Sequence, residues 1–76
     1  MNKARRKQIS EIIDALEIAM SSIESVRDDE QEYFDNIPEN LQGSDRYSIA
    51  EDAVDNLDNA YDSIQEVIDY LSAAAD

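Results

Sequence analysis

Hydrophobic residues recur along this chain in two ladders whose spacing alternates between three and four residues. The first ladder consists of Ile9, Ile12, Leu16, Ala19, Ile23, Val26, Tyr33 and Ile37. The second consists of Tyr47, Ala50, Val54, Leu57, Tyr61, Ile64, Ile68, Leu71 and Ala75. Such spacing keeps apolar side chains on one stripe of an α-helix. The pattern therefore predicts two long helices, each with one side packed against a partner.

The only proline and the only glycine of the chain separate the two ladders. We predict a first helix over about residues 3–36, a connection over 37–44 and a second helix over about 45–74. Pro38 ends the first helix, because proline lacks an amide hydrogen and disfavours helical geometry in the residue before it. Gly43 offers a permissive backbone in the connection.

Two polar residues are suited to cap these helices. Asn2 can accept a hydrogen bond from a free amide of the first turn of the first helix, and Ser44 is a suitable N-cap for the second. A connection this short makes the helices antiparallel neighbours. The predicted fold class is therefore all-α, with one domain over residues 1–76 that forms an antiparallel two-helix hairpin. Pairing residues whose numbers sum to about 83 or 84 sets large side chains against small ones.

Each helix carries a further apolar row beside its ladder. These rows consist of Ile13, Met20 and Phe34 in the first helix and of Ala53, Ala60 and Val67 in the second. Three apolar positions per heptad are typical of a helix in a bundle, whereas two suit a simple coiled coil. A single core in so small a chain rarely supplies more than about 3–5 kcal/mol. We therefore predict a homodimer that forms a four-helix bundle, with these rows at the oligomer interface.

Acidic residues dominate the charge of the chain. There are 19 Asp and Glu against 6 Lys and Arg, which gives a net charge of −13. Four of the six cations, Lys3, Arg5, Arg6 and Lys7, lie at the N-terminus. After them only Arg27 and Arg46 remain. The apolar periodicity favours a folded acidic domain over a disordered chain.

Ten of the acids form the predicted partner-binding surface. Asp28, Asp29, Glu32 and Asp35 cluster near the loop, and Asp52, Asp55, Asp58, Asp62, Glu66 and Asp69 follow the second helix. The net charge exceeds the magnitude of about 2–8 that the solubility of a small domain requires. A dense negative field attracts basic protein surfaces. The alternative is that these acids only solvate the helices.

Three further features leave their interpretation open. Ile18 and Ile49 fall outside the ladders and are the first candidates for apolar anchors of a partner, although single exposed aliphatic residues are common. Glu30 stands at a ladder position, where it either meets Arg27 or a tyrosine hydroxyl or reaches water. The basic N-terminal segment is expected to neutralise the acidic end of the second helix, with nucleic-acid contact as the alternative.

The composition excludes several classes of site. The chain has no Cys and no His, which excludes disulfides, thiolate or imidazole metal sites and His-based catalysis. No segment matches a calcium-binding loop. We expect no enzyme activity, no metal and no cofactor. No apolar run approaches the roughly 20 residues of a membrane span, and no apolar segment of a signal peptide follows the basic start. A cytoplasmic location is expected.

Three stretches, residues 1–7 (MNKARRK), 34–42 (FDNIPENLQ) and 53–60 (AVDNLDNA), resemble small acidic helical proteins of phages and prophages of Gram-positive bacteria. The resemblance covers nearly the whole chain, but its motifs are structural and assign no functional residue. It implies a phage or mobile-element origin and a place in the cytoplasm of a bacterial host cell. Small acidic proteins in that setting often bind and block a host protein, including defence nucleases.

The leading hypothesis is a non-enzymatic protein-binding module, an inhibitor whose acidic surface occludes a basic, nucleic-acid-binding surface of a host protein such as a defence nuclease. Such a surface acts somewhat as a DNA mimic. The alternative is a structural or adaptor protein, a homo-oligomeric coiled coil in which the acids only solvate the helices. A second alternative is DNA contact through the basic N-terminal arm.

Overall fold

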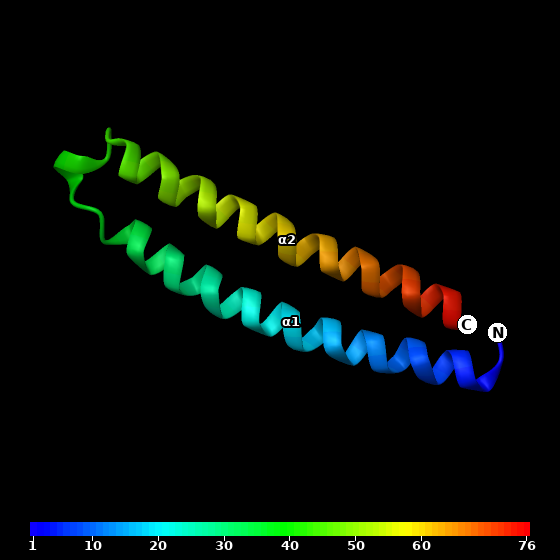
Figure 1. Ribbon diagram of the computed structural model, residues 1–76. Coiled ribbons are helices and arrows are strands. Elements are labelled where there is room, and N and C mark those ends of the chain that lie inside the picture. Colours follow the sequence, from blue (N-terminus) through cyan, green and yellow to red (C-terminus); the bar gives the residue numbers. More distant parts are fainter.

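The computed structural model describes all 76 residues and consists of two long α-helices that lie side by side and run in opposite directions (Figure 1). α1 spans Lys3–Asp35 and α2 spans Asp45–Ala75, with the short 3-10 helix η1 (Glu39–Leu41) between them. The predicted all-α hairpin is confirmed, and each end of the two helices lies within one residue of its prediction. Neither helix offers an apolar stretch long enough to cross a membrane.

The helix ends use the predicted residues in two different ways. Asn2 caps α1 as expected, because its side-chain oxygen accepts a hydrogen bond of 2.8 Å from the amide of Arg5. Ser44 stands at the N-cap position of α2, but its hydroxyl donates to the carbonyl of Leu41 and therefore closes the loop. Gly43 does not use its conformational freedom, since no residue of the chain has a positive φ.

The core of the hairpin is a single seam between the helices. Only Met20, Ile37, Ala50, Val54 and Ile68 are buried. The molecule measures 59 × 15 × 12 Å, and its smallest dimension matches the diameter of one helix. No second layer covers either helix, so most ladder residues remain partly exposed.

The structure corrects the prediction of which α1 row faces α2. The residues predicted there, Ile12, Val26 and Tyr33, are 47%, 55% and 44% exposed. The seam instead uses the neighbouring row of Ile13, Met20, Arg27 and Phe34, together with the ladder row from Ile9 to Ile37. Residues three and four positions from a ladder residue flank it on opposite sides, and both flanking rows are apolar here. The pattern alone therefore could not decide between them.

Two contacts across the seam determine how the helices are aligned. Nε of Arg27 donates to Oδ1 of Asp58 at 2.8 Å, and the rings of Phe34 and Tyr47 lie 4.7 Å apart at an angle of 36°. The residue numbers of these pairs sum to 85 and 81, on either side of the predicted 83 to 84. The predicted alignment is therefore close to the observed one.

Candidate functional site

The seam divides the surface of the hairpin into two broad faces. On one side of it Arg27 meets Asp58, and on the other the guanidinium of Arg46 lies 5.8 Å from the ring centroid of Tyr33. Residues seven positions apart share a row along a helix. These two contacts therefore assign every row of α1 and α2 to one face or the other.

The face that contains Arg27 and Asp58 is called the acidic face. Its carboxylates are Asp14, Glu17, Glu24, Asp28 and Asp35 of α1 and Glu51, Asp55, Asp58, Asp62 and Asp69 of α2. All except Asp58 belong to exposed residues. Beyond the N-terminal segment, Arg27 is the only cation on this face. Most of its negative charge is therefore uncompensated.

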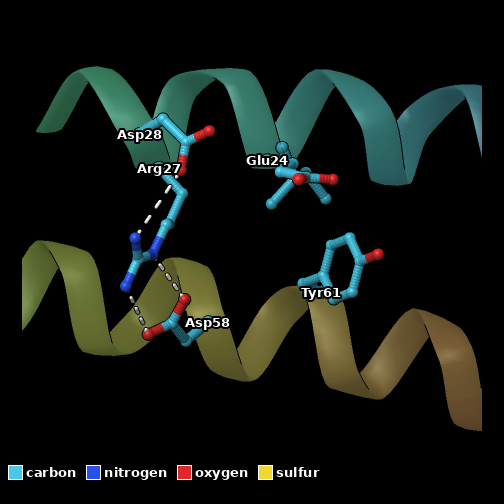
Figure 2. Close-up of a pocket in the computed structure, with 6 residues that line it drawn as sticks. Glu24, Arg27, Asp28, Asp58 and Tyr61 are labelled. Atoms are coloured by element: carbon cyan, nitrogen blue, oxygen red, sulfur yellow. Dashed lines mark hydrogen bonds and ion pairs between the residues drawn. The ribbon is translucent and has the colours of Figure 1, made fainter. Parts of the chain in front are cut away.

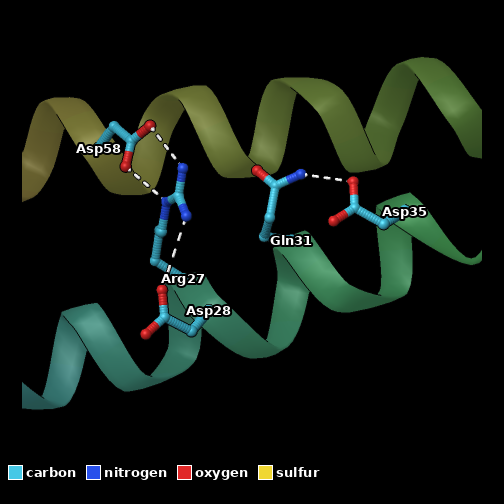
Figure 3. Close-up of polar contacts among 5 residues, drawn as sticks. All are labelled: Arg27, Asp28, Gln31, Asp35 and Asp58. Atoms are coloured by element: carbon cyan, nitrogen blue, oxygen red, sulfur yellow. Dashed lines mark hydrogen bonds and ion pairs between the residues drawn. The ribbon is translucent and has the colours of Figure 1, made fainter.

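Arg27 joins the two helices at a groove on the acidic face. The groove has a volume of about 260 Å³, and Glu24, Arg27 and Asp28 of α1 line it opposite Asp58 and Tyr61 of α2 (Figure 2). Besides the bond from Nε, Nη2 of Arg27 donates to the second oxygen of Asp58 at 3.5 Å, and Nη1 lies 3.6 Å from Asp28 (Figure 3). Asp58 is therefore held in an ion pair and is not a free acid.

The environment of Arg27 keeps it charged. The hydrogen bond to Asp58 raises the pKa of the Arg27 guanidinium above its ordinary value, and the charges of Asp58 and Asp28 add to this although partial desolvation opposes it. When folding raises the pKa of a cation, the folded state is stabilised fully at every pH below the unfolded pKa, and the stabilisation is lost only as the pH rises above that value. Arginine loses its proton far above ordinary pH. The ion pair between Arg27 and Asp58 is therefore not weakened by deprotonation of Arg27 at any ordinary pH.

This bridge also resolves the open interpretation of Glu30. Arg27 was one of its predicted partners, but the ion pairs of Arg27 go to Asp58 and Asp28. Glu30 is half-buried and has no hydrogen bond to Arg27 or to a tyrosine. Of the two predicted alternatives, the structure favours a carboxylate that reaches water. Sequence reasoning missed Asp58 as the partner, although the predicted alignment already placed it near Arg27.

A second groove lies towards the loop end of the acidic face. It has a volume of about 170 Å³ and is lined by Gln31, Phe34, Tyr47, Glu51, Val54 and Asp55. Nearby, Gln31 donates to Asp35 at 2.8 Å along α1 (Figure 3). Both grooves are smaller than the roughly 300–1,000 Å³ typical of small-molecule sites. No group of three or more acidic side chains is arranged to hold a metal ion.

The structure distributes the ten predicted surface acids over different sides of the hairpin. Asp28, Asp35, Asp55, Asp58, Asp62 and Asp69 lie on the acidic face, Asp52 and Glu66 lie on the outer edge of α2, Glu32 lies on the outer edge of α1, and Asp29 lies beyond it on the other face. The loop-end cluster is therefore divided between two faces. Its four acids lie within eight residues, which make more than one full turn of the helix, so their side chains point in different directions.

The opposite face is called the apolar face. Every exposed large hydrophobic side chain except Met1 lies on it or at its outer edge: Ile12, Ile18, Val26, Tyr33, Ile49, Val67 and Tyr70. Small exposed side chains such as Ala15, Ser22, Ala60 and Ser63 lie between them. Charged residues occur at the two ends of this face, where Arg5, Asp29 and Arg46 stand. The predicted anchors Ile18 and Ile49, 70% and 68% exposed, thus lie away from the acidic face.

The structure also changes the residues available for the predicted oligomer interface. Met20 is buried in the seam, Ile13 is half-buried there, and Phe34 packs on Tyr47. All three therefore make contacts within one hairpin. In α2, Ala60 and Val67 are exposed on the apolar face and Ala53 is half-buried at its margin. These α2 residues remain available for an oligomer interface. The exposed α1 residues on the same face are Ile12, Val26 and Tyr33.

The basic N-terminal segment makes none of the ion pairs expected of it. The chain termini lie at the same end of the hairpin (Figure 1). However, both ion pairs of the chain belong to Arg27, and Lys3, Arg5, Arg6 and Lys7 are exposed. Their charge is therefore not neutralised by direct contact with the end of α2.

Comparisons with known proteins assign no family to this hairpin. No protein-family model matches the chain, and neither the curated proteins nor the solved structures gave a match. The resemblance to small acidic phage proteins therefore stays a prediction.

Proposed function

We propose that this chain is a non-enzymatic protein-binding module whose acidic face binds a basic surface of another protein. The observation that carries the proposal is the acidic face itself: ten carboxylates on one side of the hairpin, with one central cation already engaged by Asp58. Carboxylates held this way attract a basic partner from a distance and limit the wrong orientations. Where the partner uses its basic surface to bind nucleic acid, this contact blocks that surface, and the chain acts as an inhibitor.

The scaffold of this module is proposed to be a homodimer that forms a four-helix bundle. A hairpin with only 5 buried residues of 76 has little core with which to offset the entropy of ordering both helices. A second pair of helices supplies the missing layer. This also supports the structural part of the alternative function, an adaptor, in which assembly is the activity and the acids only solvate it.

An affinity-capture experiment with two matched variants separates these functions. One variant removes three charges from the acidic face without touching the Arg27 bridge: Asp55→Asn, Asp62→Asn and Asp69→Asn. The control removes three charges elsewhere: Glu11→Gln, Glu39→Gln and Glu66→Gln. Both variants have the same net charge, so a difference between them reports the position of the charge.

We expect nuclease-treated bacterial lysate to yield basic proteins that bind the parent chain and the control but not the acidic-face variant. Their retention should fall steeply as salt rises, because screening shortens the reach of exposed charges to about 8 Å at physiological ionic strength. Equal capture by both variants would contradict a role for the acidic face. Capture of no basic protein at low salt would favour the adaptor function.

A further inference from the structure

The hairpin as a whole exposes more surface than a compact monomer of its mass. The chain has an accessible surface of 5579 Å². A globular monomer of 8.6 kDa exposes about 4,700 Å² by the usual scaling of surface with mass. The excess of about 900 Å² is close to the roughly 800 Å² that each partner contributes to a stable protein interface. One interface of standard size would therefore remove the excess.

A second copy of the chain fits the apolar face because its two helices carry complementary side chains. Along α1, the row runs Arg5, Ile12, Ala19, Val26 and Tyr33, with its smallest residue in the middle. Reversing this row against itself sets Ile12 against Val26 and brings two alanines together at the centre, where small side chains allow helices to approach closely. A two-fold axis requires such self-complementarity, since each residue of the patch must fit the same patch on the other subunit.

The charges along α1 favour one orientation of the copies. Arg5 borders the apolar face at the open end of the hairpin, and Asp29 lies near the loop end of α1, where Arg46 of α2 also stands. If both loops lay at the same end of the dimer, α1 would face α2 of the partner, and Asp29 would lie level with Ala53 and Asn56, where the apolar face has no cation. If the loops lie at opposite ends, Arg5 of each subunit comes near Asp29 and Tyr33 of the other. The second arrangement gives Asp29 of each subunit a basic neighbour.

We propose that two copies of this chain pack through their apolar faces with their loops at opposite ends, so that α1 of one copy lies antiparallel to α1 of the other and Arg5 reaches the Asp29 region of its partner. This rests on the proposed dimer and is independent of what binds the acidic face. It also gives Arg5 the ionic partner that it lacks within one hairpin.

Cysteine cross-linking tests the arrangement directly, because the chain has no cysteine of its own. The register that sets Ile12 against Val26 sets Ala19 against its own copy, so Ala19→Cys places two thiols at the proposed two-fold axis. A disulfide forms only when the Cα atoms lie within about 7 Å. Ser22 lies three residues from the axis, which separates the two Ser22 Cα atoms by about 9 Å along the helix. Ser22→Cys is therefore the control for the register, and Ser21→Cys, on the opposite side of α1, is the control for the face.

We expect the purified chain to have a molar mass of about twice 8.6 kDa by light scattering. Under mild oxidation, Ala19→Cys should give a dimer band without reductant, and Ser22→Cys and Ser21→Cys should stay monomers. With the loops at the same end, α1 would face α2 of the partner, and Ala19→Cys would not cross-link. A dimeric mass without this cross-link would overturn the orientation, and a monomeric mass would overturn the interface and leave the face to a different protein. Both readouts use the purified chain, so they are independent of the capture experiment.

A charge exchange provides a second test that needs no disulfide. Arg5→Glu should weaken the dimer by about tenfold, because it replaces two attractive exposed pairs with two repulsive ones. Adding Asp29→Arg should restore most of that loss. Lys7→Glu is the matched control, since Lys7 lies at the same end but on the opposite side of α1. A loss that Asp29→Arg does not recover, or an equal loss in the control, would contradict the proposed pairing.

Discussion

Truncation of one isoleucine in α2 measures how much of the stability of this hairpin comes from its single seam. Ile68 is 7% exposed and packs between the helices. Ile68→Ala removes three carbon atoms, which at about 0.8 kcal/mol for each buried methylene corresponds to about 2.4 kcal/mol before any cavity term. Isoleucine-to-alanine changes in cores cost about 2–5 kcal/mol. We expect about 2–3 kcal/mol, because side chains in a seam only one layer deep can move into the vacated space.

Ile49→Ala is the matched control for this change. Ile49 lies in the same helix and is 68% exposed. The two variants share any gain in helix propensity from isoleucine to alanine, so this contribution cancels in their difference. In dilute protein, where single hairpins prevail, Ile49→Ala should alter the free energy of unfolding by no more than about 0.5 kcal/mol.

Urea unfolding followed by the helical circular-dichroism signal gives both free energies, and repeating it over a range of protein concentrations separates the seam from the apolar face. The effect of Ile68→Ala should be present at every concentration. That of Ile49→Ala should grow only as dimers form, because association stabilises the folded chain by mass action. A loss below about 1 kcal/mol for Ile68→Ala, or equal losses in dilute protein, would refute the assignment of the seam.

Three other substitutions test local features of the hairpin by thermal unfolding. Asn2→Ala removes the acceptor for the amide of Arg5 and should cost about 0.5–2 kcal/mol, whereas Asn2→Asp should cost little. Gly43→Ala should be neutral or stabilise by up to about 1 kcal/mol, because Gly43 has no positive φ and nothing lies within 4 Å of an added Cβ; a clear loss would contradict this. Ala50→Leu should destabilise by about 1–3 kcal/mol, since Ala50 is 1% exposed between the helices, and a neutral result would mean that the seam opens there.

Much of this fold could be predicted because local signals agree with one another along the chain. Apolar spacing, Pro38 and the cap at Asn2 all indicate the same helix ends, and the short connection leaves an antiparallel pair as the only compact arrangement. The 3-10 turn of η1 was not predicted, since the connection has no strong signal for it. Its hydrogen bond from Ser44 to Leu41 replaces the cap expected of Ser44.

The rotation of α1 about its own axis was harder to predict. Ile12 and Ile13, or Ala19 and Met20, are neighbours in sequence that point to different sides, and either row completes an apolar stripe. Contacts between pairs of residues, one from each helix, decide which row faces α2. Phe34 meets Tyr47, and Arg27 meets Asp58, within one seam. Such contacts depend on both helices at once and cannot be found from either ladder alone. The same rotation determines which residues form the acidic and the apolar faces.

Together, the two proposed contacts imply a specific shape for the dimer. If the apolar faces pack against each other, the acidic faces turn outward on opposite sides of the four-helix bundle. The dimer then carries twice the net charge of −13, and Arg27 remains bridged on each side. In this proposed dimer, two basic partners would bind without competing, because the bundle separates their sites. The proposed adaptor and inhibitor functions are thus compatible with one scaffold, in which assembly would use the apolar face and recognition the acidic face. A variant of either face should then leave the other intact.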